Sequence, residues 1–304
     1  MEPRRVLWCG HVDAGKSTLC GHLLYTLGVF SDHDLAVAER TAQDKKLAGW
    51  KYAYLLDILS DEQERGKTRD YCETPCVLGT QQYVFVDTPG HHAFLRHMIE
   101  GAEGATEALW VVSLRPSETE KSLADTEHLL LLRCLGVQHL VIVLNKCDLM
   151  EEDVLVSVKT KTAQIAKKYG FGSSHISFCC VSGWTGEGLT APGPWGGADL
   201  VATLTSLPPP RHDTPPEYTT DTLTLKGVVT GDQLLTPGLI LVLQGSRQTL
   251  EVEVESVVSP TKKPFARQGE QATLSLRILQ GPTTLGAKRF VLRNGDATVF
   301  LGVK

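Results

Sequence analysis

The sequence predicts an α/β domain with a doubly wound, mostly parallel sheet, followed by a small all-β barrel. Up to residue 207, short apolar runs alternate with helical patterns, as strands and helices do in parallel sheets. After residue 216, apolar and polar residues alternate with a period of two, which indicates strands with one buried face. A proline-rich stretch separates the two patterns. We therefore expect domains at 1–207 and 217–304, joined by a linker at 208–216.

The composition is that of an ordinary globular protein. The chain has 304 residues, of which 42% are apolar, so it can bury a sizeable core in each domain. Its formal charge of −5 argues against tight nonspecific binding of nucleic acid, which needs concentrated positive charge; a local positive patch on the second half is the alternative. No apolar run reaches the ~18 residues of a membrane helix, and the amino-terminal residues do not resemble a secretory signal. These features predict a cytoplasmic protein.

The eight cysteines are spread over predicted strands and helices without the paired spacing of metal ligands. Buried free thiols are the favoured interpretation. Cys72 and Cys76 allow a metal hypothesis, but the sequence offers no second pair near them.

A glycine-rich loop follows the first predicted strand. Residues 10–17 read Gly-His-Val-Asp-Ala-Gly-Lys-Ser, between an apolar run and a helical pattern. The two glycines allow a polyphosphate to lie against bare backbone amides at the start of a helix. Lys16 would meet the β and γ phosphates, and Ser17 would offer its hydroxyl to Mg²⁺. The spacing predicts a nucleotide site; a glycine turn that merely begins a helix is the alternative.

A charged stretch at 61–68 lacks apolar periodicity and predicts a mobile loop. If the glycine loop holds a nucleoside triphosphate, a threonine at this distance is the expected second protein ligand of Mg²⁺, and Thr68 is the candidate. The order of the loop would then depend on the γ-phosphate, as in a switch. Taken by itself, the stretch favours a solvated loop with an incidental threonine.

The strand predicted at 83–86 ends in the pentapeptide Asp-Thr-Pro-Gly-His. Asp87 can hold a Mg²⁺-bound water, and Gly90 can present its amide to the γ-phosphate. His91 would lie beside that phosphate and orient the attacking water.

Two further strand ends indicate which base is bound. After the strand at 139–144 comes Asn-Lys-Cys-Asp, where Asp148 can accept two hydrogen bonds from guanine N1 and N2, whereas adenine has an acceptor at N1. Lys146 would lie along the base plane, and Asn145 would tie this loop to the glycine loop. A backbone amide of the Ser-Gly-Trp loop at 182–184 can meet guanine O6. The carboxyl ends of parallel strands share one sheet edge, so one site is expected.

Beyond the linker, about six or seven short strands punctuated by glycine and proline suggest a small closed barrel. It contains no catalytic constellation. The favoured role is that of a docking or lever domain.

Together these motifs resemble the translational GTPases of the elongation factor Tu and one-alpha superfamily, over nearly the whole chain. The resemblance rests on GHVDAGKST, KYAYLLD, DEQERGKT, DTPGHHAF, NKCD and VSGWTGEG. The chain is most similar to the branch that includes eukaryotic release factor three and the ribosome-rescue GTPase that partners Pelota. The resemblance implies a P-loop GTPase domain that binds GTP or GDP with Mg²⁺.

The residues and the resemblance together give one set of candidate positions. The catalytic candidates are His91, Lys16 and Thr68, and the metal candidates are Ser17, Thr68 and Asp87. The nucleotide-binding candidates are Asp13, Ala14, Gly15, Lys16, Ser17, Thr18, Asp87, Gly90, Asn145, Lys146, Asp148, Ser182, Gly183 and Trp184.

The segments 263–272 and 288–299 look like the third domain of the family, whereas its second domain, another barrel, has no counterpart in the sequence. In relatives that second barrel helps hold the aminoacyl end of transfer RNA, so ordinary transfer-RNA delivery is not favoured. The resemblance implies as partners the ribosome and a release- or rescue-type protein factor bound through the barrel. We expect a monomer with no membrane association.

The leading hypothesis is a Mg²⁺-dependent GTPase that switches between GTP and GDP states in elongation, termination or ribosome rescue. The alternative is a GTP-dependent adaptor away from the ribosome, with little or no hydrolysis, motivated by the missing second barrel. A third hypothesis is a GTPase subunit that regulates a metabolic enzyme, as in sulfate activation. The KYAYLLD and VSGWTGEG segments argue against the third.

Overall fold

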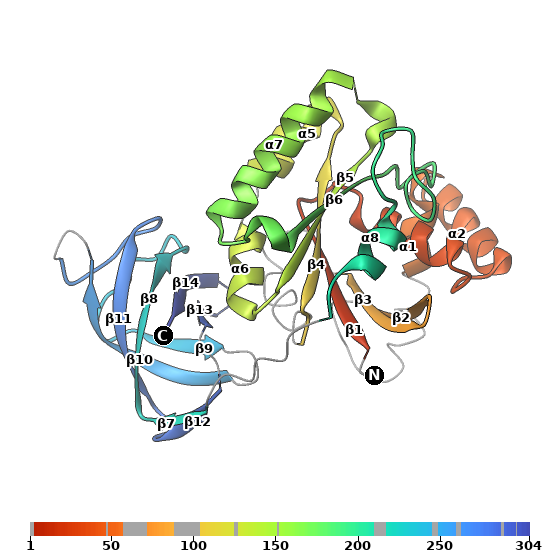
Figure 1. The fold of residues 1–304 in the computed structure, drawn as a ribbon. Coiled ribbons are helices and arrows are strands. Elements are labelled where there is room, and N and C mark those ends of the chain that lie inside the picture. Colours follow the sequence, from red (N-terminus) through yellow and green to blue (C-terminus); the bar gives the residue numbers. More distant parts are fainter. Residues whose placement is uncertain are drawn as a thin grey trace. The chain divides into compact units, whose positions relative to one another are not determined.

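The chain forms two compact units, an α/β domain and a β-barrel, which are described separately (Figure 1). The computed structural model describes residues 3–46, 48–56, 72–87, 104–124, 127–150, 152–209, 217–244, 249–259, 263–286, 289–295 and 297–304.

Six strands form the sheet of the α/β domain, in the order β2-β3-β1-β4-β5-β6 (Figure 1). They are β1 (Arg4–Cys9), β2 (Cys72–Leu78), β3 (Gln81–Asp87), β4 (Glu107–Ser113), β5 (His139–Asn145) and β6 (Ile176–Cys180). β2 pairs antiparallel with β3, and the other neighbours pair in parallel. Because β3 and β4 flank β1 on opposite sides, the strand order reverses there, and ligand sites form at such a switch point.

Helices cover both faces of this sheet, with α1 and α8 on one side and α5 and α7 on the other (Figure 1). The α-helices are α1 (Lys16–Thr26), α2 (Asp32–Asp44), α5 (Pro116–Ala124), α6 (Glu127–Leu135), α7 (Glu152–Lys168) and α8 (Leu200–Ser206). Short 3₁₀ turns occur at η1 (Ala48–Trp50), η3 (Cys147–Leu149) and η4 (Ser173–His175), and residues 51–56 are helical. The doubly wound, mostly parallel sheet is therefore confirmed.

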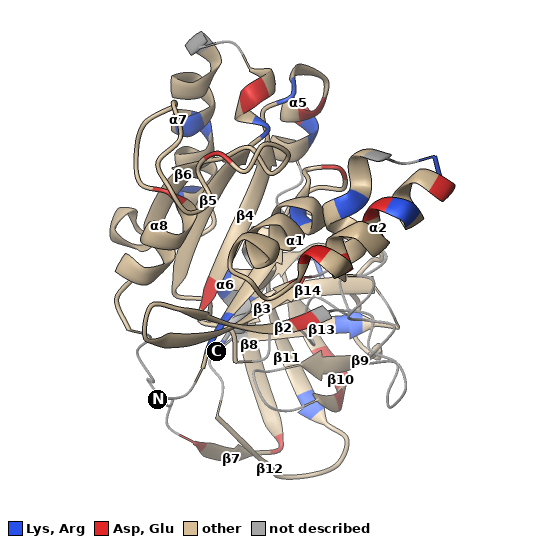
Figure 2. Ribbon diagram, turned by 90° about the vertical axis from the view of Figure 1, so that its right-hand side faces the viewer, with Lys and Arg blue, Asp and Glu red and all other residues tan. Residues whose placement is uncertain are grey.

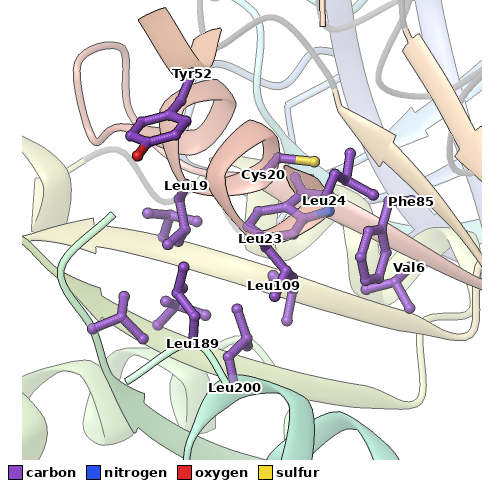
Figure 3. Close-up of a cluster of buried hydrophobic side chains, with 14 of the residues drawn as sticks. Val6, Leu19, Cys20, Leu23, Leu24, Tyr52, Phe85, Leu109, Leu189 and Leu200 are labelled. Carbon is purple, nitrogen blue, oxygen red and sulfur yellow. The ribbon is translucent and has the colours of Figure 1, made fainter. Parts of the chain in front are cut away.

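One hydrophobic core cluster of the α/β domain lies between the sheet and the helices α1 and α8 (Figure 3). Leu109 of β4 packs there with Leu19 and Leu23 of α1 and Leu200 of α8, and all four side chains are fully buried. β4 and β5 are buried along their whole length. This explains why both strands read as continuous apolar runs and not as alternating patterns.

Polar side chains fix the starts of two helices. Ser31 and Asp34 form a capping box at α2, in which the Ser31 amide donates to Asp34 Oδ2 at 2.8 Å and the Asp34 amide donates to Ser31 Oγ at 3.3 Å. At α8, the Asp199 side chain accepts a hydrogen bond from the Ala202 amide at 2.8 Å.

Six antiparallel strands close the barrel in the order β10-β11-β8-β14-β13-β9 (Figure 1). They are β8 (Thr222–Val229), β9 (Ile240–Gln244), β10 (Thr249–Val258), β11 (Gln271–Ile278), β13 (Arg289–Asn294) and β14 (Ala297–Val303), and β7 (Tyr218–Thr220) pairs separately with β12 (Thr283–Leu285). Alternate side chains such as Leu223 and Leu225 fill the interior. Gly227 lies so close to β14 that a Cβ atom there would fall 1.9 Å from the Leu301 carbonyl oxygen. The predicted barrel is confirmed.

Charged side chains of both signs are interspersed on the described surface. Figure 2 shows acidic and basic residues side by side along α2. On the barrel, Arg277 of β11 forms ion pairs with Glu253 and Glu255 of β10. These neighbouring charges of opposite sign give neither element the one-sided positive field that nonspecific nucleic-acid binding requires.

The cysteines with described side chains are buried thiols, as the sequence predicted: Cys9, Cys20, Cys76, Cys147, Cys179 and Cys180. Burial raises the pKa of the Cys76 thiol to about 12. Within the described part of the chain, no three His, Cys, Asp or Glu side chains gather as metal ligands, and no helix is long and apolar enough to cross a membrane.

Candidate nucleotide-binding site

The glycine loop connects the carboxyl end of β1 to α1. Its backbone is left-handed at Asp13 and at Gly15, with φ angles of 65° and 87°. At Gly10 a Cβ atom would fall 2.3 Å from the Val111 carbonyl oxygen, and at Gly15 it would fall 2.6 Å from Asn145 Nδ2. Both glycines are therefore required by the close approach of β4 and of Asn145 at the end of β5.

The loop provides the two features that bind phosphate. The Lys16 ammonium group donates to the carbonyl oxygens of Gly10 and His11, each at 3.0 Å, and is therefore held inside the loop. α1 begins after Gly15 without a hydrogen bond from a side-chain cap. The first backbone amides of α1 and the positive end of its dipole are thus available to bind an anion.

A hydroxyl and a carboxylate meet beside the loop. Ser17 Oγ donates to Asp87 Oδ2 at 2.8 Å, because the parallel pairing of β1 with β3 brings Asp87 next to the start of α1. Hydroxyl and carboxylate oxygens are the hard ligands that Mg²⁺ prefers, so this donor set fits the cation. The structure brings together two of the three predicted metal ligands. Thr68 lies outside the described residues, as do Gly90 and His91.

Asn145 connects three loops. Its Nδ2 donates to the Ala14 carbonyl oxygen at 2.8 Å, and its Oδ1 accepts from the Gly183 amide at 2.9 Å. The side chain is buried, and both ends of its amide are hydrogen-bonded. The loop after β5, the glycine loop and the loop after β6 therefore form one continuous structure.

Lys146 crosses from the loop after β5 to the glycine loop. Its Nζ donates to the Asp13 carbonyl oxygen at 2.7 Å and lies 2.6 Å from Glu118 Oε2 of α5. Burial tends to raise the pKa of Glu118, but the hydrogen bonds from Lys146 and Ser113 outweigh it and hold the pKa below its usual value. Glu118 was not among the predicted site residues, because it lies far from Lys146 along the chain and no local pattern marks it.

The remaining base-reading candidates differ in exposure. Asp148, in η3, is exposed, and Trp184 is half exposed, so both can face a ligand. Ser182 is fully buried, and its hydroxyl accepts from the Thr185 amide at 3.1 Å, which shapes the turn around Gly183. Thr18 lies in the first turn of α1.

The parallel sheet, the glycine loop between β1 and α1, and the closed antiparallel barrel define a P-loop α/β domain followed by a β-barrel, the architecture of translational GTPases. Residues 1–236 match the family described as "Elongation factor Tu GTP binding domain". The chain belongs to this family.

Two curated relatives are archaeal elongation factors 1-alpha. The protein of Staphylothermus marinus is 37% identical over 215 residues, which cover 66% of this chain and 49% of the relative. That of Ignicoccus hospitalis is 39% identical over 215 residues, 66% of this chain and 48% of the relative. The matched region is thus about half the length of these relatives.

Among solved structures, the GTPase-like domain of S. cerevisiae Ski7, bound to GTP, superposes with a TM-score of 0.72 and 13% sequence identity. The superposition covers 99% of this chain and 96% of the Ski7 chain. At this identity the likeness concerns the fold alone.

Proposed function

We propose that this chain binds GTP and GDP with Mg²⁺, hydrolyses GTP, and acts as a switch in translation. The observation that carries the proposal is the Asn145 bridge. It joins the phosphate loop to both loops that are predicted to read guanine, with hydrogen bonds of 2.8 and 2.9 Å. Such a bridge holds the two loops predicted to contact the base at a fixed distance from the phosphate loop. A single nucleotide that spans these loops requires such a fixed distance.

Each group has a defined task in this proposal. Lys16 and the first amides of α1 bind the phosphates, and Asp148 accepts hydrogen bonds from the base. Ser17 and Asp87 would hold Mg²⁺, which neutralises phosphate charge when bound. His91 would orient the attacking water, and Thr68 would complete the metal site.

Titration calorimetry of the pure chain with GDP, GTP and ATP in the presence of Mg²⁺ tests the binding. Saturable heat with both guanine nucleotides and none with ATP is expected. Absence of heat from every guanine nucleotide would disprove the proposal. GTP turnover tests hydrolysis: His91→Ala should lower it while leaving GDP affinity unchanged, and an unchanged rate would remove His91 from the scheme.

The proposed partners are the ribosome and a release- or rescue-type protein factor that binds the barrel. On its sequence motifs we assign the chain to the branch that includes eukaryotic release factor three and the ribosome-rescue GTPase that partners Pelota, and we propose a cytoplasmic location. Co-sedimentation with ribosomes in the presence of a non-hydrolysable GTP analogue should bring the protein into the pellet.

One observation favours the adaptor as a second candidate. In the described residues, one six-stranded barrel follows the α/β domain. The described residues include no second six-stranded barrel, and the resemblance implies that relatives use that barrel for transfer RNA. A protein that binds GTP, stays in the supernatant and turns over no GTP even with ribosomes present would be an adaptor.

A further inference from the structure

His22 lies behind the loop that is predicted to contact guanine O6. It belongs to α1, six positions after Lys16, and its side chain is buried. Its Nδ1 lies 2.8 Å from the Gly183 carbonyl oxygen. A carbonyl oxygen only accepts hydrogen bonds, so Nδ1 must carry the proton. Burial lowers the pKa of His22, which keeps the ring neutral with this proton on Nδ1 at neutral pH.

Packing fixes the orientation of the His22 ring. The ring stacks on Tyr52, with centroids 3.8 Å apart and planes only 6° from parallel. Figure 3 shows Tyr52 beside α1. On the side of the loop after β6, a Cβ atom at Gly186 would fall 2.9 Å from His22 Cε1. Tyr52 therefore covers one face of the imidazole, the turn at Gly186 lies close to its Cε1–Nε2 edge, and its Nδ1 donor faces Gly183.

The Gly183 carbonyl determines where the next amide points. In a planar trans peptide, the N–H group points opposite to the C=O group, so the Gly183 carbonyl and the Trp184 amide face opposite ways. His22 holds the carbonyl toward α1. The Trp184 amide is thereby turned away from α1. The preceding peptide is fixed independently, since the Gly183 amide donates to Asn145.

The same loop also packs directly on α1. A Cβ atom at Gly183 would fall 3.2 Å from both Cα and Cβ of Leu19, which lies three residues before His22 on the same face of the helix. The loop therefore lies against α1 at two positions about one turn apart, closely packed at Leu19 and hydrogen-bonded at His22.

We infer that His22 is a positioning residue for guanine recognition, which orients the Gly183–Trp184 peptide so that its amide can donate to O6 of the base. The inference rests on the proposed function and adds a residue to it. His22 itself touches no ligand. Its effect is expected at one atom of the base, because Lys16, the first amides of α1 and Asp148 are proposed to bind other parts of the nucleotide.

The test compares two nucleotides that differ at position 6 of the base. GDP carries oxygen there, and 6-thioguanosine diphosphate carries sulfur, a much weaker hydrogen-bond acceptor, while both keep the N1–H and N2–H donors that Asp148 is proposed to read. The variant His22→Phe keeps a flat ring for Tyr52 and removes the donor. We expect it to weaken GDP about five- to tenfold, the effect of one hydrogen bond, and to change the affinity for the analogue less than about twofold. The ratio of the two affinities, measured by calorimetry, is the readout.

Two further variants make the comparison specific. His22→Asn retains an N–H donor on the atom bound to Cγ, so its ratio of the two affinities should stay near that of the unsubstituted protein. This variant tests the inference even if His22→Phe does not fold. His139→Phe is the matched control, because His139 is a buried histidine at the other end of β5. It should leave the ratio unchanged.

The outcomes are distinct. The role of His22 would be overturned if His22→Phe lost affinity equally for both nucleotides. It would also be overturned if the ratio of the two affinities fell in His22→Asn as far as in His22→Phe. In both cases the proposed binding of guanine nucleotides would still hold. If the unsubstituted chain binds neither nucleotide, the proposed function fails and the inference falls with it.

Discussion

Lys146 Nζ and Glu118 Oε2 lie 2.6 Å apart, which joins the loop after β5 to α5. Both side chains are about four-fifths buried, at 22% and 18% exposure. Glu118 also accepts a hydrogen bond from Ser113 Oγ at 2.6 Å. The aliphatic part of Lys146, which is expected to lie along the base, is thus held at its far end by a carboxylate from another element.

Substitution Glu118→Gln should weaken guanine-nucleotide binding. The neutral amide no longer balances the Lys146 charge, and we expect about a tenfold loss of GDP affinity, the effect of one charge-assisted hydrogen bond. Calorimetric titration with GDP measures it. Glu120→Gln is the control, because Glu120 is an exposed residue of the same helix. Equal affinities for the two variants would contradict the role of Glu118.

The same carboxylate should make stability depend on pH. The pKa of Glu118 lies below its ordinary 4.5 in the folded protein, so its charged form stabilises the fold. This contribution is complete above pH 4.5 and is lost as the pH falls through the lowered pKa. Urea unfolding should therefore show a constant difference between the unsubstituted protein and Glu118→Gln from pH 7 to about 5, which shrinks at lower pH. A difference that grows on acidification would contradict the assignment.

Asp148→Asn should change which base is preferred. An asparagine amide donates where guanine N2 also donates, whereas xanthine offers an oxygen at this position. We expect the affinity for GDP to fall by about a hundredfold and that for xanthosine diphosphate to rise, since the mismatch leaves polar groups unpaired. Competition between the two nucleotides measures the change. Unchanged selectivity would reject Asp148 as the base-reading residue.

The sequence predicted the structure best where the residues of a motif are close together in the chain and their spacing determines the local backbone. The glycine loop, the Asn145 bridge to it and the period-two strands of the barrel followed from spacing and periodicity alone. Glu118, His22 and Tyr52 were not assigned roles. Each acts on a residue far away in the chain, and nothing in its local sequence separates it from an ordinary helix residue. Such contacts are set by how α1, α5 and the helical segment 51–56 pack, which periodicity does not specify.

Ser17→Ala should remove most of the Mg²⁺ dependence of nucleotide binding. Ser17 Oγ is paired with Asp87 at 2.8 Å, and its loss takes one oxygen from the donor set. We expect GDP affinity in Mg²⁺ to fall at least about tenfold, toward the value measured in EDTA, because Mg²⁺ tolerates few departures from its oxygen geometry. Ser17→Thr keeps the hydroxyl and should retain the dependence. Equal Mg²⁺ dependence in the alanine variant would exclude Ser17 as a ligand.

An ion pair at the opposite end of the sheet should matter for stability alone. Arg4 of β1 and Glu107 of β4 are buried, and Arg4 Nε donates to Glu107 Oε1 at 2.7 Å. Arg4 also donates to the carbonyl oxygens of Leu207 and Pro208, at 3.2 and 3.0 Å, and so fixes the chain where it leaves α8.

Glu107→Ala leaves the Arg4 charge buried without its partner, and we expect a loss of about 3–5 kcal/mol in the free energy of unfolding. Glu73→Ala is the comparison, since Glu73 pairs with Arg5 at 2.8 Å but both side chains are about one-quarter exposed. That variant should lose at most about 1 kcal/mol. Urea unfolding of both variants measures the two losses. Similar values would show that water reaches the Arg4–Glu107 pair, and GDP affinity should be unchanged in either variant that folds.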